Sequence, residues 1–247
     1  MSLSLTSTNF AYHAGKTSAI DDFSYTFKPG TFYGIFGANG SGKSTLLKIL
    51  TGELTATNPA LLDGKVLHKL PRIEVARKLA YASQSEELIL PFTVRECIAL
   101  GRYAWGDNGA DLIDRLLKEW NVEHLQNNSF AELSGGERQK IKLLRILAQD
   151  TSYILLDEPA SSLDWAKQLE LYENLQKIAH QQNKCIIMVC HDLYIAPAFI
   201  DEMLLMHHGK LIYSGLPDSP RAAQAVSQAF ERKFAITRQP HSVQISW

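Results

Sequence analysis

The chain has few cysteines and no pattern that would join them into a scaffold. Only three of its 247 residues are cysteine, at positions 97, 185 and 190, and none forms a C-x-x-C spacing. Two of them flank an apolar segment, Cys185-Ile-Ile-Met-Val-Cys190. This arrangement argues against a disulfide framework and predicts buried free thiols in a reducing cytosol.

Long apolar runs and an excess of either charge are also missing. No run approaches the roughly 18 apolar residues of a membrane span, so a partner would have to bring the protein to any membrane it serves. The net charge of -1 and the pI near 6.7 give no basic footprint for nucleic acid. The N-terminal segment has neither a basic start nor an apolar core, so we expect no secretory signal. The sequence has no internal repeat, and its length allows one large or two small domains.

One glycine-rich segment carries a specific motif. Residues 37–44, Gly-Ala-Asn-Gly-Ser-Gly-Lys-Ser, match the phosphate-binding loop G-x-x-x-x-G-K-[ST]. The glycines let the backbone bring its N–H groups onto a phosphate chain. Lys43 supplies a point charge for the β- and γ-phosphates, and the Ser44 hydroxyl is suited to Mg²⁺. Because a strand-like segment precedes the motif and a helical one follows, it predicts an anion site at a helix N-terminus rather than a glycine-rich turn.

Two acids follow a second apolar strand. Tyr153-Ile-Leu-Leu156 ends in Asp157 and Glu158, and burying charge is costly unless it has a task. We interpret Asp157 as facing Mg²⁺, usually through water, and Glu158 as polarising an attacking water. Taken alone, the pair would equally fit a strand end that reaches solvent.

A Ser-Gly-Gly segment opens an amphipathic helix further along the chain. In Leu133-Ser-Gly-Gly-Glu-Arg-Gln139, the free N–H groups and the positive dipole end suit a phosphate. Ser134 and Glu137 also have the spacing of a capping box, and the two interpretations can hold together. Two anion-binding helix starts in one chain suggest one nucleotide held from two sides.

Strand-like and helical segments alternate along the chain. Residues 3–36 predict strands with turns at 13–15 and 28–30. The helices that we expect after them are at 43–52, 74–78, 111–120, 137–149 and 165–182, and the strands at 79–83, 153–156 and 186–189. This alternation predicts an α/β fold with a parallel sheet, into which a mostly helical block at residues 86–150 is inserted.

In this order, the motifs resemble those of the ATP-binding subunits of ABC transporters, over nearly the whole chain. The matching positions are Lys43, Gln84, Ser134-Gly-Gly136, Asp157-Glu158, Ser161-Ser-Leu-Asp164 and His191. The resemblance implies a P-loop NTPase (ABC ATPase) core with a mostly parallel sheet, N-terminal antiparallel β strands and an inserted helical subdomain. It implies a single domain, with its nucleotide-binding core at 1–85 and 151–217, its helical signature subdomain at 86–150 and a C-terminal helix and tail at 218–247.

The resemblance also implies roles for individual residues in ATP hydrolysis. The catalytic residues would be Glu158, His191, Gln84 and Lys43. Residues expected to bind ATP are Tyr12, Gly37, Asn39, Gly40, Ser41, Gly42, Lys43, Ser44 and Thr45, and, from a second copy in trans, Ser134, Gly135, Gly136 and Asp164. Mg²⁺ is expected at Ser44, Gln84 and Asp157, partly through water. Tyr12 would stack on adenine, although Phe10 or Tyr12 could equally belong to the core. Leu144 departs from the family's pattern, which often has a small alanine on the signature helix.

The segment after Gln84 indicates a subfamily. Residues 91–103, Pro-Phe-Thr-Val-Arg-Glu-Cys-Ile-Ala-Leu-Gly-Arg-Tyr, are similar to that segment in importers of iron-siderophore complexes, haem and cobalamin. Whatever the function, Thr93 would cap a helix packed by Val94, Ile98 and Leu100.

The resemblance implies an assembly on a membrane. It would comprise a cytoplasmic homodimer with ATP at its interface, peripheral on the inner face of the cell membrane. Its partners would be integral membrane permease subunits and, indirectly, an extracytoplasmic substrate-binding protein. Two alternatives stay open: the ATPase subunit of an exporter, and a soluble ABC ATPase in DNA maintenance or translation. Single catalytic motifs, near-neutral charge and the lack of a long heptad stretch argue against nucleic-acid work.

Overall fold

A six-stranded sheet organises the computed structural model, which describes residues 2–13, 17–83, 91–161, 163–232, 235–239 and 242–246. Its strands are β3 (Phe32–Phe36), β6 (Leu79–Ala82), β7 (Tyr153–Asp157), β8 (Cys185–Val189), β9 (Glu202–His207) and β10 (Lys210–Gly215). They lie in the order β10-β9-β3-β8-β7-β6, and all neighbours run parallel except β10 and β9. Every residue of β3, β7 and β8 is buried, as expected for parallel strands covered on both faces. The predicted parallel α/β fold is confirmed.

A smaller antiparallel sheet lies beside the large one. It contains β1 (Leu3–Phe10), β2 (Ile20–Phe27), β4 (Leu61–Leu62) and β5 (Lys65–Val66), in the order β2-β1-β4-β5. The helix α1 (Lys43–Leu50) shares one apolar cluster with both sheets. The expected N-terminal antiparallel strands are therefore confirmed, and they hold α1 against the parallel sheet.

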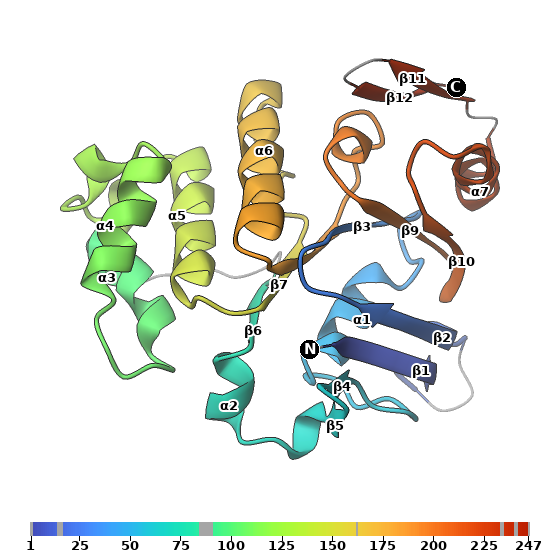
Figure 1. The fold of residues 1–247 in the computed structure, drawn as a ribbon, viewed down its shortest axis with the longest axis horizontal. Helices are drawn as coiled ribbons and strands as arrows, with labels where there is room; N and C mark the ends of the chain where they lie inside the picture. The colour runs from blue at the N-terminus through green and yellow to red at the C-terminus, as the bar shows by residue number, and fades with distance from the viewer. Residues whose placement is uncertain are drawn as a thin grey trace.

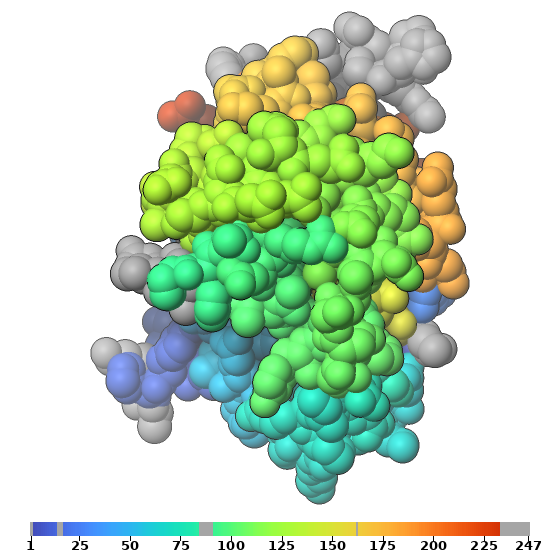
Figure 2. All heavy atoms as spheres, turned by 90° about the vertical axis from the view of Figure 1, so that its left-hand side faces the viewer, coloured from blue at the N-terminus to red at the C-terminus, as the bar shows by residue number. Residues whose placement is uncertain are grey.

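Helices between β6 and β7 form a separate layer at one side of the molecule (Figure 1). They are α3 (Val94–Ala99), α4 (Ala110–Glu119) and α5 (Gly135–Ala148), and the short α2 (Arg72–Ala76) precedes β6. Figure 2 shows this block, in green, covering that face above residues 50–80. Its interior is apolar, and Leu144 of α5 is completely buried.

The helix α3 begins with the expected cap. The side chain of Thr93 accepts a hydrogen bond from the backbone N–H of Glu96 in a capping box, and Val94 and Ile98 are buried. The prediction that Leu100 packs this helix is wrong, because Leu100 is 39% exposed. It lies just past the end of α3, in a 3-10 turn at Leu100–Arg102 that points its side chain outward.

The remaining helices flank the sheet. The helix α6 (Trp165–Gln181) joins β7 to β8 and stands next to α5, whereas α7 (Pro220–Phe230) packs on β9 and β10 at the opposite side (Figure 1). No helix in the described part of the chain is long and apolar enough to cross a membrane. The three cysteines are buried and free, as predicted.

The C-terminal tail contains a pair of strands after the expected helix. After α7, β11 (Ala235–Gln239) pairs antiparallel with β12 (Ser242–Ser246), with Ala235 opposite Ser246 and Gln239 opposite Ser242.

Candidate functional site

The loop between β3 and α1 has a backbone that only glycine fits at two points. Gly37 and Gly42 have φ angles of +149° and +104°. A Cβ at Gly37 would lie 2.3 Å from the carbonyl oxygen of Met206, and one at Gly42 would lie 2.4 Å from that of Ala19. Among the described residues, no side chain caps the start of α1. No capping side chain therefore competes with an anion for its first N–H groups.

Lys43 lies across this loop. Its Nζ donates hydrogen bonds to the carbonyl oxygens of Gly37 and Ala38, at 2.9 and 3.0 Å. The residue is 6% exposed, and burial lowers the pKa of its ammonium, while Glu158 and Asp157 act in the opposite direction. A buried cation held by neutral carbonyls gains stabilisation from a phosphate.

The hydroxyl of Ser41 adds a second sign of a phosphate site. Its Oγ is buried and has no hydrogen-bond partner within the described structure. Buried polar atoms are rarely left unpaired, and a phosphate oxygen could accept from this hydroxyl. The loop thus combines open N–H groups, a buried ammonium and an unpaired hydroxyl in one concave segment.

Ser44 and Asp157 meet at the edge of this loop. The Ser44 Oγ donates to Asp157 Oδ1 at 3.2 Å. Asp157 ends β7 and is buried, and this burial raises the pKa of its carboxyl above the usual range. A hydroxyl and a carboxylate are the oxygen ligands that Mg²⁺ takes from proteins when phosphates and water complete its octahedron. The described ranges contain no cluster of three His, Cys, Asp or Glu side chains that could hold a metal ion without such help.

Glu158 and His191 form a second polar pair next to Asp157. They follow the neighbouring parallel strands β7 and β8, whose carboxyl ends meet at one edge of the sheet, and His191 Nε2 contacts Glu158 Oε1. Glu158 has a φ of +53°, a left-handed conformation that is uncommon for a residue with a side chain. Such strain persists where the surrounding structure imposes it, often at functional sites.

Tyr12 stands at the entrance to the same site. It is 56% exposed, its hydroxyl is hydrogen-bonded to Thr45 Oγ1 at 3.0 Å, and its ring meets Phe10 edge to face. It lines a cavity of about 420 Å³ whose other lining residues are Ala19, Asn39, Gly40, Gly42, Lys43, Ser44, Thr45 and Glu158. The ring is therefore outside the core, and its exposed part is free to stack on a flat ligand.

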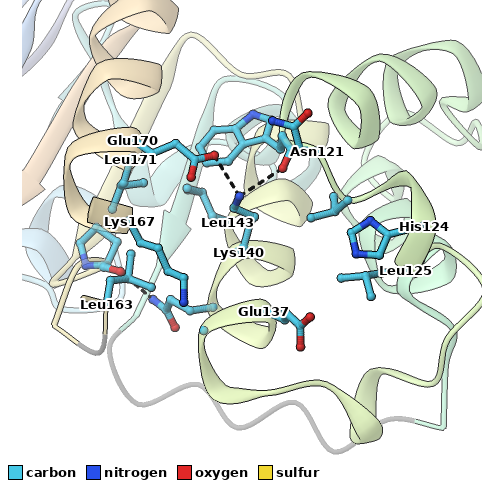
Figure 3. A pocket seen from close by; sticks show the side chains of 15 residues that line it. Asn121, His124, Leu125, Glu137, Lys140, Leu143, Leu163, Lys167, Glu170 and Leu171 are labelled. Atoms are coloured by element: carbon cyan, nitrogen blue, oxygen red, sulfur yellow. Dashed lines mark hydrogen bonds and ion pairs between the residues drawn. The ribbon is translucent and has the colours of Figure 1, made fainter. Parts of the chain in front are cut away.

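The Ser-Gly-Gly segment lies elsewhere, at the start of α5. Ser134 Oγ accepts a hydrogen bond from the backbone N–H of Glu137, and Glu137 Oε2 accepts one from the backbone N–H of Ser134, so the predicted capping box is confirmed. Gly136 lines a different cavity, between α5 and α6 (Figure 3). Asp164 caps α6 by accepting from the backbone N–H of Lys167.

The structure therefore separates the expected site residues into two groups. One group lies around the phosphate-binding loop and contains residues 37–45, Tyr12, Asp157, Glu158 and His191. The other group lies at the starts of α5 and α6 and contains Ser134–Gly136 and Asp164. Gln84, expected to be catalytic and to bind Mg²⁺, falls outside the described residues. No sequence motif indicated that Ala19 and Met206 close the loop from behind, or that Phe230 and Glu231 at the end of α7 share a cavity with residues 38–41.

Comparison with known families gives a match over most of the chain. Residues 20–161 match the family model described as "ABC transporter". Hemin import ATP-binding protein HmuV of Vibrio parahaemolyticus is 31% identical over 244 residues, which cover 96% of this chain and 94% of that protein. Cobalamin import ATP-binding protein BtuD of Halobacterium salinarum is 31% identical over 230 residues, covering 91% of this chain and 58% of that protein.

Solved structures share the fold. A chain from the inward-facing conformation of an ABC transporter described as of the metal-chelate type superposes with a TM-score of 0.81 at 22% identity, covering 99% of this chain and 96% of that one. The ATP-binding cassette MJ0796, in a dimeric post-hydrolysis state bound to ADP and Pi, gives 0.77 at 24% identity, over 87% and 98% of the two chains.

Proposed function

Because this chain belongs to the ABC transporter family, as its ATP-binding member, we propose that it binds and hydrolyses ATP at the site around Lys43 to power an importer. The observation that carries this proposal is the convergence of Lys43, the Ser44–Asp157 pair and the Glu158–His191 pair at the edge of the sheet. Lys43 supplies a cation for the phosphates, the Ser44–Asp157 pair supplies oxygen ligands for Mg²⁺, and Glu158 supplies a base. These are the parts that phosphoryl transfer needs.

Each residue would have a separate task during hydrolysis. The N–H groups of the loop and the Lys43 ammonium would hold the β- and γ-phosphates, and Tyr12 would stack on adenine. Ser44 and Asp157 would hold Mg²⁺, which when bound neutralises charge on the phosphate oxygens. Glu158 would accept a proton from the attacking water at its carboxylate, and His191 would orient that carboxylate through their contact. Gln84 would complete the site.

The separation of the two groups of site residues supports a homodimer. Ser134–Gly136 and Asp164 would contact ATP that is bound to the loop of a second copy. The cassette MJ0796 is dimeric in its post-hydrolysis state, which is consistent with this arrangement. At 24% identity, its similarity to this chain extends to the fold alone. We propose that two copies bind permease subunits at the inner face of the cell membrane, through the helical subdomain 86–150, while the core 1–85 and 151–217 holds the nucleotide. An extracytoplasmic binding protein would deliver the substrate.

The class of substrate is supported by similarity to named importers. Residues 91–103 have the pattern expected of importers of iron chelates, haem and cobalamin, and the names of the similar proteins are hemin and cobalamin import subunits. We propose a large metal chelate of this kind, with an iron-siderophore complex, haem and cobalamin as the candidates.

A transport assay tests this function directly. The chain would be co-expressed with the permease and binding protein encoded nearest to it and reconstituted in vesicles with ATP inside. We expect uptake of one of the three chelates, and no uptake with the Glu158→Gln variant. ATP-driven extrusion would favour an exporter instead. Fractionation with ribosomes or DNA rather than with membranes that contain the permease would contradict the transport function.

A further inference from the structure

The starts of α5 and α6 lie next to each other, with an apolar cavity between them. The cavity has a volume of about 180 Å³, and Figure 3 shows Leu125, Leu143, Leu163 and Leu171 on its walls. Lys167 projects from α6 along this wall toward α5 (Figure 3). Its aliphatic stem thus has apolar support while its ammonium stays at the water-exposed mouth, as is common for lysine at such places.

The ammonium of Lys167 lies beside both segments that are expected to act in trans. Its Nζ is 3.0 Å from Asp164 Oδ2. A Cβ built on Gly136 would lie 3.6 Å from the same Nζ, so the ammonium lies over the second glycine of the Ser134–Gly136 segment. One cation of α6 therefore reaches the start of α5 and the cap of α6 at once.

The present partner of Lys167 holds it weakly. The side chains of Lys167 and Asp164 are 57% and 58% exposed, and exposed pairs of this kind contribute little to stability. The neighbouring carboxylate of Glu137 is already engaged by Ser134 in the capping box. The long flexible stem of Lys167 can therefore exchange Asp164 for a more highly charged anion at small cost.

We propose that Lys167 Nζ binds the terminal phosphate of the ATP held by the phosphate loop of a second copy. This inference rests on the proposed function, because it needs Gly136 and Asp164 to face that nucleotide. When the two copies close, water is excluded from the ammonium and the phosphate, and their attraction becomes stronger than that of an exposed ion pair. ADP lacks the terminal phosphate, so Lys167 makes closure depend on ATP.

The test measures association in the Glu158→Gln background, in which we expect ATP to stay bound without being hydrolysed. The probe is MgATP, with MgADP as its matched ligand, and the variants are Lys167→Met, Lys167→Arg and Lys177→Met. Methionine retains an unbranched stem without the charge, and Lys177 is exposed on the same helix, so Lys177→Met controls for the loss of one positive charge. Sedimentation over a range of protein concentrations gives the dissociation constant of the dimer, and a fluorescent ATP analogue gives the affinity of the monomer.

We expect Lys167→Met to raise the dissociation constant of the ATP-bound dimer by roughly tenfold per site, or about 100-fold for two equivalent sites. Lys167→Arg should keep most of the affinity, Lys177→Met should change nothing, and all monomers should bind ATP equally. The dimer of Lys167→Met should also respond less to added salt.

Two results would overturn the inference, and they are distinguishable. If Glu158→Gln dimerises with ATP and Lys167→Met dimerises equally well, the Lys167 contact is wrong while the two-copy arrangement stands. If the Glu158→Gln parent never dimerises with ATP, the two-copy arrangement fails and the inference fails with it.

Discussion

At the scale of single residues, the site is built from buried charges that are incompletely matched. Lys43 is a buried cation that donates to neutral carbonyls, and Asp157 is a buried carboxyl whose pKa is raised by burial. Each is costly in the protein alone and would gain from a triphosphate with Mg²⁺. The protein thus gives up stability at the positions that we propose for nucleotide and Mg²⁺ binding.

Lys43→Ala should sharply weaken ATP binding and abolish hydrolysis. The change removes a charge aimed at the γ-phosphate, where negative charge develops in the transition state. Calorimetric titration with MgATP and a phosphate-release assay measure the two effects. Lys48→Ala, on the same helix, is the control. Near-normal ATPase activity of Lys43→Ala would contradict the assignment of the loop.

Glu158→Gln should retain ATP binding and lose turnover by roughly 10²–10⁴-fold. The amide is nearly the same size as the carboxylate but cannot accept the proton of the attacking water. Single-turnover hydrolysis measures the chemical step, and filter binding measures the bound ATP. A variant that fails to bind ATP would show that Glu158 acts in binding rather than in catalysis.

Asp157→Asn should stabilise the nucleotide-free protein by about 1 kcal/mol at pH 7, an order-of-magnitude value for removing an unfavourable functional charge. Burial raises the folded-state pKa of Asp157 above the unfolded-state pKa, which is near 3.9. The protonated carboxyl therefore contributes stability that is fully present below the unfolded-state pKa. This stability is lost as the pH rises through the folded-state pKa. The advantage of Asp157→Asn should therefore be present at pH 7 and disappear toward pH 4.

Thermal unfolding between pH 4 and pH 8 measures this difference. Asp114→Asn, at an exposed carboxylate, is the control and should change stability little. The Asp157→Asn protein should also lose Mg²⁺-dependent hydrolysis. Lower stability of Asp157→Asn at pH 7 would mean that the carboxylate is favourably paired rather than strained.

At the scale of elements, the first turn of α5 differs from its later turns in what surrounds it. Its first turn presents Ser134–Gly136, whereas its later turns pack into the large apolar cluster through Ile141 and Leu144. The capping box at Ser134 and the buried side chain of Leu144 together fix where the helix starts and how it sits. The position of the segment is therefore set by its own cap and by the packing of the helix that follows.

Leu144→Ala should destabilise the protein by about 2–5 kcal/mol, because it removes a completely buried side chain and leaves a cavity. Leu100→Ala is the matched control, since the same truncation at a 39% exposed residue should cost far less. Urea unfolding measures both. Equal effects of the two substitutions would show that α5 relaxes to fill the space that Leu144 leaves.

At the scale of the whole molecule, one copy holds only part of the expected nucleotide site. The phosphate loop faces the carboxyl end of the sheet, and the start of α5 belongs to the helical layer at the side of the molecule (Figure 1). Two copies related by a symmetry axis could bring the loop of one to the α5 start of the other, twice. ATP binding and association are then thermodynamically linked.

The Glu158→Gln protein should become dimeric when ATP is added, and Ser134→Arg in that background should block the dimer while ATP still binds to the loop. Arginine is too large for the contact of Ser134–Gly136 with a nucleotide in trans. Sedimentation with and without ATP, over a range of protein concentrations, is the measurement. A mass that stays constant at high concentration, or a Ser134→Arg protein that dimerises equally well, would contradict the two-copy site.

Local sequence determined the features that depend on neighbours along the chain. The loop at 37–44 needs glycines at Gly37 and Gly42, whose backbone conformations other residues rarely adopt, and the capping boxes at Thr93 and Ser134 join residues three apart. The apolar strands β7 and β8 were evident from their composition because both faces are buried. These signals were sufficient for the α/β fold class and for the loop, acid and helix-cap residues. The roles of Tyr12, Gln84, Asp164 and His191 were expected only from the resemblance to a family.

Only the tertiary structure decided how distant segments meet. The order of β7 and β8 in the sheet places Glu158 against His191, although 33 positions separate them. Packing and strand pairing also decide features that one segment does not reveal. These are the exposure of Tyr12 and Leu100, the hairpin β11–β12, and the position of Lys167 over Gly136. The physical reason is that periodicity fixes which face of an element is buried, whereas its partner across the fold is chosen by the packing of the whole chain.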